Sequence, residues 1–198
     1  MSLPIKDGFD DFNYIIIGNM DISDDSKQTL DRLKQMDLST KDALIHLGNF
    51  AYKVQDDNGE KGDEYFNTLQ EINSVVPYIV TPGSEDRFDK GQFFNFRFKM
   101  PGVPIVDKED KGFKDHENHY FSYNQGNAHF VSINFEYPLM LNTDGGDNMF
   151  KWFYEDLYNA SVNIERKWII VFTHHPIICQ NPKKSTSAYS VIDNFMCF

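Results

Sequence analysis

Three short apolar segments, each followed by a polar turn with glycine, constrain the fold most strongly. They are Tyr14–Ile17, Ala43–Leu47 and Tyr78–Val80, and helix-like segments separate them. Short apolar runs bounded by turn residues predict buried strands. Strands that alternate with helices predict a parallel sheet with right-handed crossovers. In open α/β sheets, sites form where the carboxyl ends of the strands meet loops, so we expect a site at these turns.

The connecting segments carry helix signals. Ser23 offers an N-cap, and the two aspartates that follow it suit the positive end of a helix dipole. A second helix is predicted from about Asp63 to Val76, because its apolar residues repeat at helical spacing, and Pro77 ends it. The first part of the chain therefore has the order β-α-β-α-β.

The later part of the chain predicts a second group of strands. Residues His119–Tyr123 and Ala128–Asn134 have the pattern of a hairpin. A third helix is expected from about Asn148 to Ser161, and a buried strand from Lys167 to Thr173. His174 follows directly after the end of that strand.

Composition places limits on the class of protein. The 198 residues fit one domain, 1–198, and 40% hydrophobic residues are enough for a sizeable core. The net charge of −11 makes nucleic acid an unfavourable partner. We expect no transmembrane segment, because no apolar run reaches the roughly 20 residues that a spanning helix needs. The sequence does not indicate the cellular compartment of the protein. Cys179 and Cys197 can form a disulfide or remain two free thiols.

Several stretches together resemble a known family. Gly48-Asn49-Phe50-Ala51-Tyr52 resembles the Gly-Asp-x-x-Tyr motif of the purple acid phosphatases, in the calcineurin-like metallophosphoesterase superfamily. Val171-Phe172-Thr173-His174 resembles the family's strand that delivers a metal-binding His. The resemblance implies an α/β sandwich of two mixed β-sheets flanked by helices. The second sheet is expected to be incomplete, because the C-terminal part of the family fold is missing here. Three explanations stay open: the sequence is part of a longer protein, the C-terminal tail substitutes, or a protein partner completes the fold. If the chain is complete, we expect a protein partner or an oligomer to complete the fold.

The resemblance also assigns site residues, position by position. Most metal-binding positions carry a different residue from the family's: Asn19 and Asn49 replace Asp, and Ser84 replaces Asn. Tyr52 and His174 are retained, and Glu85 stands where the family has the His that assists ester cleavage.

These substitutions predict a loss of catalysis. A two-metal site needs carboxylates to hold and bridge the cations. The amides of Asn19 and Asn49 carry no charge, and Asn commonly braces turns instead. Glu85 adds negative charge where a phosphate ester would arrive. We predict a domain without dinuclear-metal phosphatase activity or cofactor, acting as a structural or binding subunit.

An alternative interpretation keeps the activity. Asp21, Glu85 and Asp86 are carboxylates close to the substituted positions. Together with Asn19, Asn49 and His174 they could form a mononuclear site for calcium or magnesium, which accept oxygen ligands. A functional family-like site would instead hold iron with zinc or manganese. Either site would make the chain an active metal-dependent phosphomonoesterase.

Overall fold

A computed structural model describes residues 12–51, 53–87, 91–101, 118–135 and 145–175. Tyr52, Cys179 and Cys197 lie outside these described residues, so the predictions that concern them remain predictions.

The first sheet contains the three strands predicted from the glycine turns. β1 (Tyr14–Ile17), β2 (Ala43–His46) and β3 (Tyr78–Val80) are parallel and stand in the order β1-β2-β3. The parallel order confirms the prediction from the β-α-β-α-β pattern. Residues at the carboxyl ends of the three strands are therefore neighbours.

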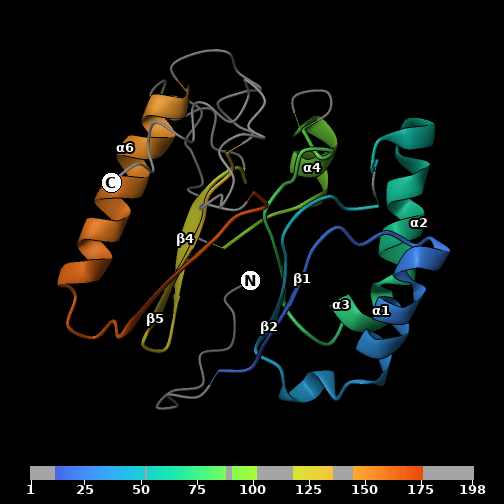
Figure 1. Cartoon of the computed structure of the whole chain (residues 1–198), viewed down its shortest axis with the longest axis horizontal. Coiled ribbons are helices and arrows are strands. Elements are labelled where there is room, and N and C mark those ends of the chain that lie inside the picture. Colours follow the sequence, from blue (N-terminus) through green and yellow to red (C-terminus); the bar gives the residue numbers. More distant parts are fainter. Residues whose placement is uncertain (1–11, 52, 88–90, 102–117, 136–144, 176–198) are drawn as a thin grey trace, which may run out of the picture.

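Helices cover the outer face of this sheet (Figure 1). They are α1 (Asp24–Gln35), α2 (Glu60–Thr68) and α3 (Gln70–Asn73), with short 3-10 turns η1 (Leu38–Thr40) and η2 (Asp56–Gly59) between elements. Their buried residues share one core with the sheet: Leu33, Tyr65, Leu69 and Ile72 pack with Leu44 and Val80. The predicted helix from Asp63 to Val76 is thus two helices, which begin earlier and are interrupted at Leu69.

Ser23 is the N-cap residue of α1, as predicted, but its side chain makes no capping bond. Its hydroxyl instead donates to the Asp21 carboxylate at 2.6 Å. The start of α1 is thereby tied to the turn that follows β1.

The second sheet is mixed. β4 (Phe121–Gln125) and β5 (Ala128–Ser132) form the predicted antiparallel hairpin, and β6 (Trp168–Phe172) pairs with β5 in parallel. α6 (Gly145–Val162) covers the outer face of this sheet, and α4 (Gln92–Arg97) lies between the two halves of the chain in sequence (Figure 1). Both sheets with their helices form the α/β sandwich expected from the resemblance.

The two sheets face each other across a second core. Ile45 and Ile79 from the first sheet pack with aromatic rings of the second, including Phe121 and Phe130. A hydrogen bond also joins the sheets, in which the Tyr14 hydroxyl donates to Gln125 Oε1 at 2.6 Å. It lies where β1 begins and β4 ends.

β6 differs from the prediction of a buried strand. Trp168 is 62% exposed, and Ile169 and Ile170 are also exposed, whereas Phe172 is buried. The reason is topological, because β6 is an edge strand and pairs on one side only among the described strands. The apolar sequence of Trp168–Phe172 predicts burial, but periodicity does not indicate which strand lies at the edge of a sheet.

Candidate functional site

The turns after β1, β2 and β3 and the end of β6 meet at one corner of the sandwich. A Cβ on Gly48 would lie 2.4 Å from the backbone nitrogen of Gly83, so these two turns touch through their backbones. A Cβ on Gly83 would lie 2.4 Å from Asn49 Oδ1 and 2.9 Å from His174 Nδ1. The Asn19 N–H donates to the Gly48 carbonyl at 3.0 Å. Segments from both sheets therefore build the site.

Asn19 and Asn49 bond directly to each other. Asn49 Nδ2 donates to Asn19 Oδ1 at 2.7 Å, and Asn49 Oδ1 accepts the Glu85 N–H at 2.9 Å. Both asparagines have left-handed backbones, with φ of 52° and 58°, which Asn adopts more readily than most residues. The buried Asn49 side chain thus connects the turns after β1, β2 and β3.

Asp86 joins the turns after β2 and β3 through hydrogen bonds to their backbones. It is buried, and its carboxylate accepts the N–H groups of Asn49 at 2.6 Å, Gly83 at 2.8 Å and Phe50 at 3.1 Å. Burial raises the pKa of Asp86 to about 7, and the three N–H donors act in the opposite direction. Both carboxylate oxygens are engaged with backbone.

His174 joins the second sheet to the first. Its Nδ1 lies 2.6 Å from the Leu47 carbonyl, which can only accept, so Nδ1 carries the proton. In the neutral form of the ring, Nε2 is the unprotonated nitrogen, and this is the tautomer that a metal-binding His with such a partner uses. This retained residue is also half-buried at the corner.

The other predicted site residues are less enclosed. The Glu85 side chain is exposed and Ser84 is half-buried. Burial raises the pKa of Asp21, but hydrogen bonds from Ser23 and Ser26 outweigh it and hold the pKa below its usual range. Asp21 is therefore charged at neutral pH, beside the turn that carries Asn19.

Comparisons with known proteins agree with the resemblance. The chain is 33% identical over 168 residues to acid phosphatase type 7 from Danio rerio and 29% identical over 165 residues to the protein of that name from Mus musculus. Its fold matches a purple acid phosphatase from yellow lupin (Lupinus luteus) seeds with a TM-score of 0.62, at 19% identity, over 84% of this chain and 31% of that one.

The chain is related to the purple acid phosphatases. The two alignments to acid phosphatase type 7 cover 81% of this chain but 35% of each relative, so it spans about a third of their length. No protein-family model matches the chain.

The two asparagines at the substituted positions of this purple acid phosphatase-like domain are engaged with donors of the chain itself. Asn19 Oδ1 and Asn49 Oδ1 both accept hydrogen bonds within the site. In the described part of the chain, no three side chains of His, Cys, Asp or Glu are grouped so that they could hold a metal ion.

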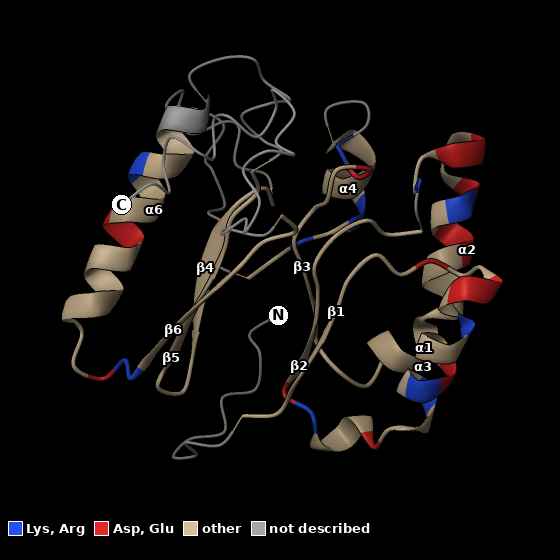
Figure 2. Cartoon of the chain, viewed as in Figure 1, with Lys and Arg blue, Asp and Glu red and all other residues tan. Residues whose placement is uncertain are grey.

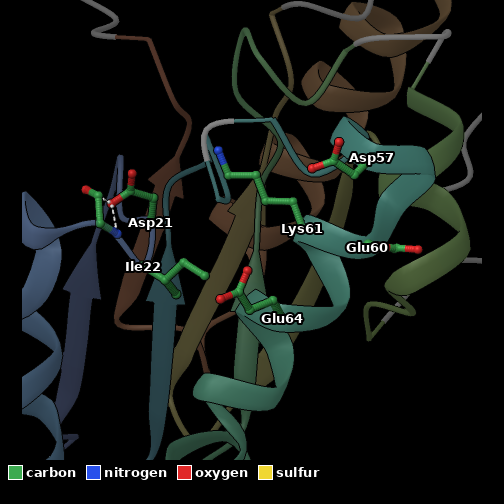
Figure 3. Close-up of a pocket in the computed structure, with 7 residues that line it drawn as sticks. Asp21, Ile22, Asp57, Glu60, Lys61 and Glu64 are labelled. Carbon is green, nitrogen blue, oxygen red and sulfur yellow. Dashed lines mark hydrogen bonds between the residues drawn. The ribbon is translucent and has the colours of Figure 1, made fainter.

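An acidic groove adjoins the turn after β1 (Figure 3). Its volume is about 620 Å³, and its lining is predominantly acidic: Asp21, Ile22, Ser23, Asp57, Glu60, Lys61 and Glu64. Four carboxylates against one lysine give this side of the purple acid phosphatase-like site a negative potential.

His46 is a site neighbour that the sequence did not reveal. It is fully buried at the end of β2, with Nδ1 2.5 Å from the Tyr78 hydroxyl and 3.2 Å from the Tyr65 hydroxyl. Burial, with a smaller effect of His174, lowers the pKa of His46 to about 3, so the imidazole is neutral. Its ring contacts Phe50 behind the Asn49 turn. The only signal was a histidine inside an otherwise apolar strand.

No helix in the described portion of the chain is long and apolar enough to cross a membrane.

Proposed function

We propose that this purple acid phosphatase-like domain has lost dinuclear-metal phosphatase activity and serves as a structural or binding subunit. The observation that carries the proposal is the hydrogen bond between Asn49 Nδ2 and Asn19 Oδ1, 2.7 Å long.

The amide pair replaces an arrangement that needs cations. Two carboxylates at this distance repel each other unless positive charge lies between them. An amide offers a donor as well as an acceptor, so Asn19 and Asn49 satisfy each other directly. The corner is thereby closed by the chain's own side chains, and the scaffold keeps its shape without a metal centre.

Charge around the corner also favours a role other than phosphate-ester cleavage. Glu85 is exposed at the position of the family's His, and the acidic groove lies beside Asn19. These carboxylates raise the energy of an approaching phosphate dianion.

The edge of β6 supports the binding role. An exposed edge strand presents unpaired backbone groups to other strands. Trp168, Ile169 and Ile170 add exposed apolar side chains to that edge. An extended segment of a protein partner would pair with β6 by adding a strand to the sheet.

The alternative function, a phosphomonoesterase with a mononuclear site, has one observation in its favour, the tautomer of His174. Asp86 gives it little support, because three backbone N–H groups already bond to its carboxylate. Asp21 is engaged by Ser23 in the same way.

Hydrolysis of p-nitrophenyl phosphate tests the proposal. The protein is assayed with iron, zinc, manganese, calcium or magnesium and, in parallel, with a chelator. We expect no hydrolysis above buffer in any condition, and no difference between the wild type and His174→Ala. Metal-dependent hydrolysis that a chelator and His174→Ala both abolish would establish the alternative. As a positive control, Asn19→Asp, Asn49→Asp, Ser84→Asn and Glu85→His are combined, and elemental analysis reports whether this variant gains bound metal.

A further inference from the structure

One acceptor sequence for N-linked glycosylation lies in the last turn of α6. In the whole sequence, only Asn159 is followed two residues later by Ser or Thr, in Asn159-Ala160-Ser161. The middle residue is Ala and not Pro, as an acceptor requires. α6 ends at Val162 and is the outermost described layer on this side of the molecule (Figure 1). The acceptor sequence therefore lies at the surface.

The Asn159 side chain has room for a bulky attachment. Asn159 is exposed, whereas the neighbouring Ala160 is buried. Among the hydrogen bonds between described residues, none uses the Asn159 amide, whereas the amides of Asn118 and Asn124 bond within the fold. A sugar linked to Asn159 Nδ2 therefore displaces no contact that holds α6 in place.

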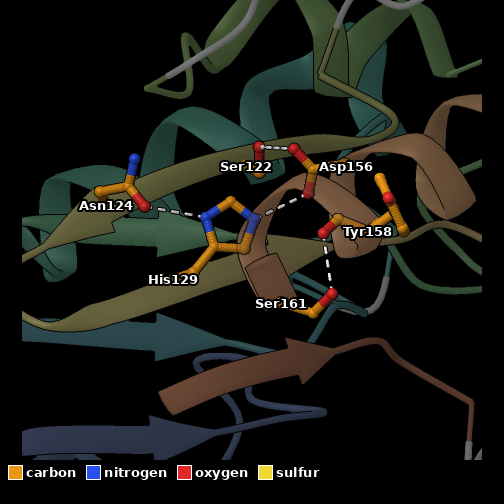
Figure 4. A network of polar contacts seen from close by, with 6 residues as sticks. All are labelled: Ser122, Asn124, His129, Asp156, Tyr158 and Ser161. Carbon is orange, nitrogen blue, oxygen red and sulfur yellow. Dashed lines mark hydrogen bonds and ion pairs between the residues drawn. The ribbon is translucent and has the colours of Figure 1, made fainter. Parts of the chain in front are cut away.

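Ser161 supplies the hydroxyl of the acceptor sequence. In the folded helix its Oγ donates to the Tyr158 carbonyl at 2.8 Å (Figure 4). Ser commonly makes such a bond to the preceding turn of a helix, so this contact by itself indicates no modification. Glycan transfer takes place on an extended chain, before α6 forms, and the Ser161 hydroxyl is then free to take part.

Exposed apolar side chains lie beside Asn159 and supply the second observation. Tyr158 and Val162 are 60% and 59% exposed. Val162 follows Tyr158 by four residues and Asn159 by three, so it is a neighbour of both on the helix surface. A surface helix ordinarily presents polar residues on its outer face. A sugar on Asn159 would lie against Val162 and reach the Tyr158 ring, and would give this face a hydrophilic cover.

We propose that Asn159 carries an N-linked oligosaccharide whose first sugars cover these apolar side chains. In the transfer, Asn159 Nδ2 bonds to the anomeric carbon of an oligosaccharide carried on a lipid diphosphate. The bond from that carbon to the diphosphate oxygen breaks, the lipid diphosphate leaves with the electron pair, and Nδ2 gives up one proton. The proposal implies that the chain passes through the endoplasmic reticulum, and it does not depend on the proposed loss of catalysis.

Expression of the full chain in insect cells, with a cleavable leader that directs it to the endoplasmic reticulum, tests the site. We expect peptide N-glycosidase F to remove a single glycan and to leave Asp at position 159, which peptide mass spectrometry detects. Asn159→Gln and Ser161→Ala should each lose the glycan completely. Asn163→Gln is the matched control and should keep it, because Asn163 is also exposed but is followed by Ile and Glu. A wild type without a glycan, or a glycan that persists in Asn159→Gln, would overturn the proposal.

Binding of the fluorescent dye ANS, which reports exposed apolar surface, tests the cover. The glycosylated protein should bind less dye than Asn159→Asp, which has the same residue that the glycosidase leaves. Tyr158→Lys should reduce this difference, whereas Phe96→Lys should leave it unchanged, because Phe96 is 82% exposed on α4. Thermal unfolding verifies that the variants are folded. If the glycosylated protein and Asn159→Asp bind the dye equally, the sugars do not cover this face.

Discussion

Replacing Asn49 by Asp tests whether the site is built to stand without metal. The substitution keeps the shape of the side chain, and Asp tolerates the left-handed backbone of residue 49 as Asn does. It removes the Nδ2 donor and places an oxygen 2.7 Å from Asn19 Oδ1. The Glu85 N–H keeps an acceptor. The change therefore isolates the donor and the charge.

The expected cost has two parts. The lost hydrogen bond contributes about 1 kcal/mol. A carboxylate here is buried and lies near Asp86, so its pKa in the folded protein is raised; a rise of about two units costs about 2.7 kcal/mol at pH 7. We expect the free energy of unfolding to fall by about 3–4 kcal/mol at pH 7. Because the folded pKa is raised, the charge part is present above that pKa and is relieved as the pH falls, so about 1 kcal/mol remains near pH 4.

Urea unfolding with a chelator, at pH 7 and at about pH 4, measures both parts. The control is Asn67→Asp, the same change at an exposed position of α2, which should alter the stability by less than about 0.5 kcal/mol. The reasoning fails if Asn49→Asp is as stable as the wild type at pH 7 in chelator, because the amide donor would then have no structural role.

Three further predictions concern the neighbourhood of the site and α6. Gly83→Ala should destabilise the protein by about 3 kcal/mol in urea unfolding, because its Cβ would collide with backbone and side chains. The control is Gly18→Ala, whose Cβ would have its nearest neighbour at 3.4 Å, and this substitution should cost less than about 1 kcal/mol. Burial lowers the folded pKa of His46 to about 3, so between pH 7 and pH 5 the unfolded chain gains a proton at His46 that the folded chain does not. The stability of the wild type relative to His46→Gln should therefore fall by about 2 kcal/mol over this range, because the raised pKa of Asp86 affects both proteins equally. The same pH dependence in both would refute the assignment. Asp156→Ala should lower the midpoint of thermal unfolding through a loss of about 3 kcal/mol of stability, because Ser122 and His129 of the second sheet lose their acceptor (Figure 4). Glu155 is exposed, so Glu155→Ala should change the midpoint little.

Local patterns in the sequence were sufficient for the strands and the order of elements. The glycine turns after Ile17 and Leu47 placed the first sheet, because short apolar runs between turn residues have few other interpretations. The break at Leu69 and the exposure of Trp168 could not be predicted in this way. Both depend on which elements are neighbours in space, and local periodicity does not contain that information.

The site shows the same division. The sequence predicts that Asn19, Asn49 and His174 belong to one site, and in the structure they lie at the same corner of the sandwich. The sequence did not show that Asp86 supports the turns through backbone N–H groups, because nothing in an Asp identifies its hydrogen-bond donors. It also gave no indication of the neutral, buried state of His46, which results from the rings packed around it.

Two hydrogen bonds between described residues join the two halves of the sandwich at separate points. The Tyr14–Gln125 bond lies where β1 begins, and the His174–Leu47 bond lies beyond the end of β2. Hydrophobic attraction has no preferred direction, whereas a hydrogen bond requires its two groups to be aligned. Because the two bonds lie at opposite ends of the strands, they fix the direction of one sheet relative to the other.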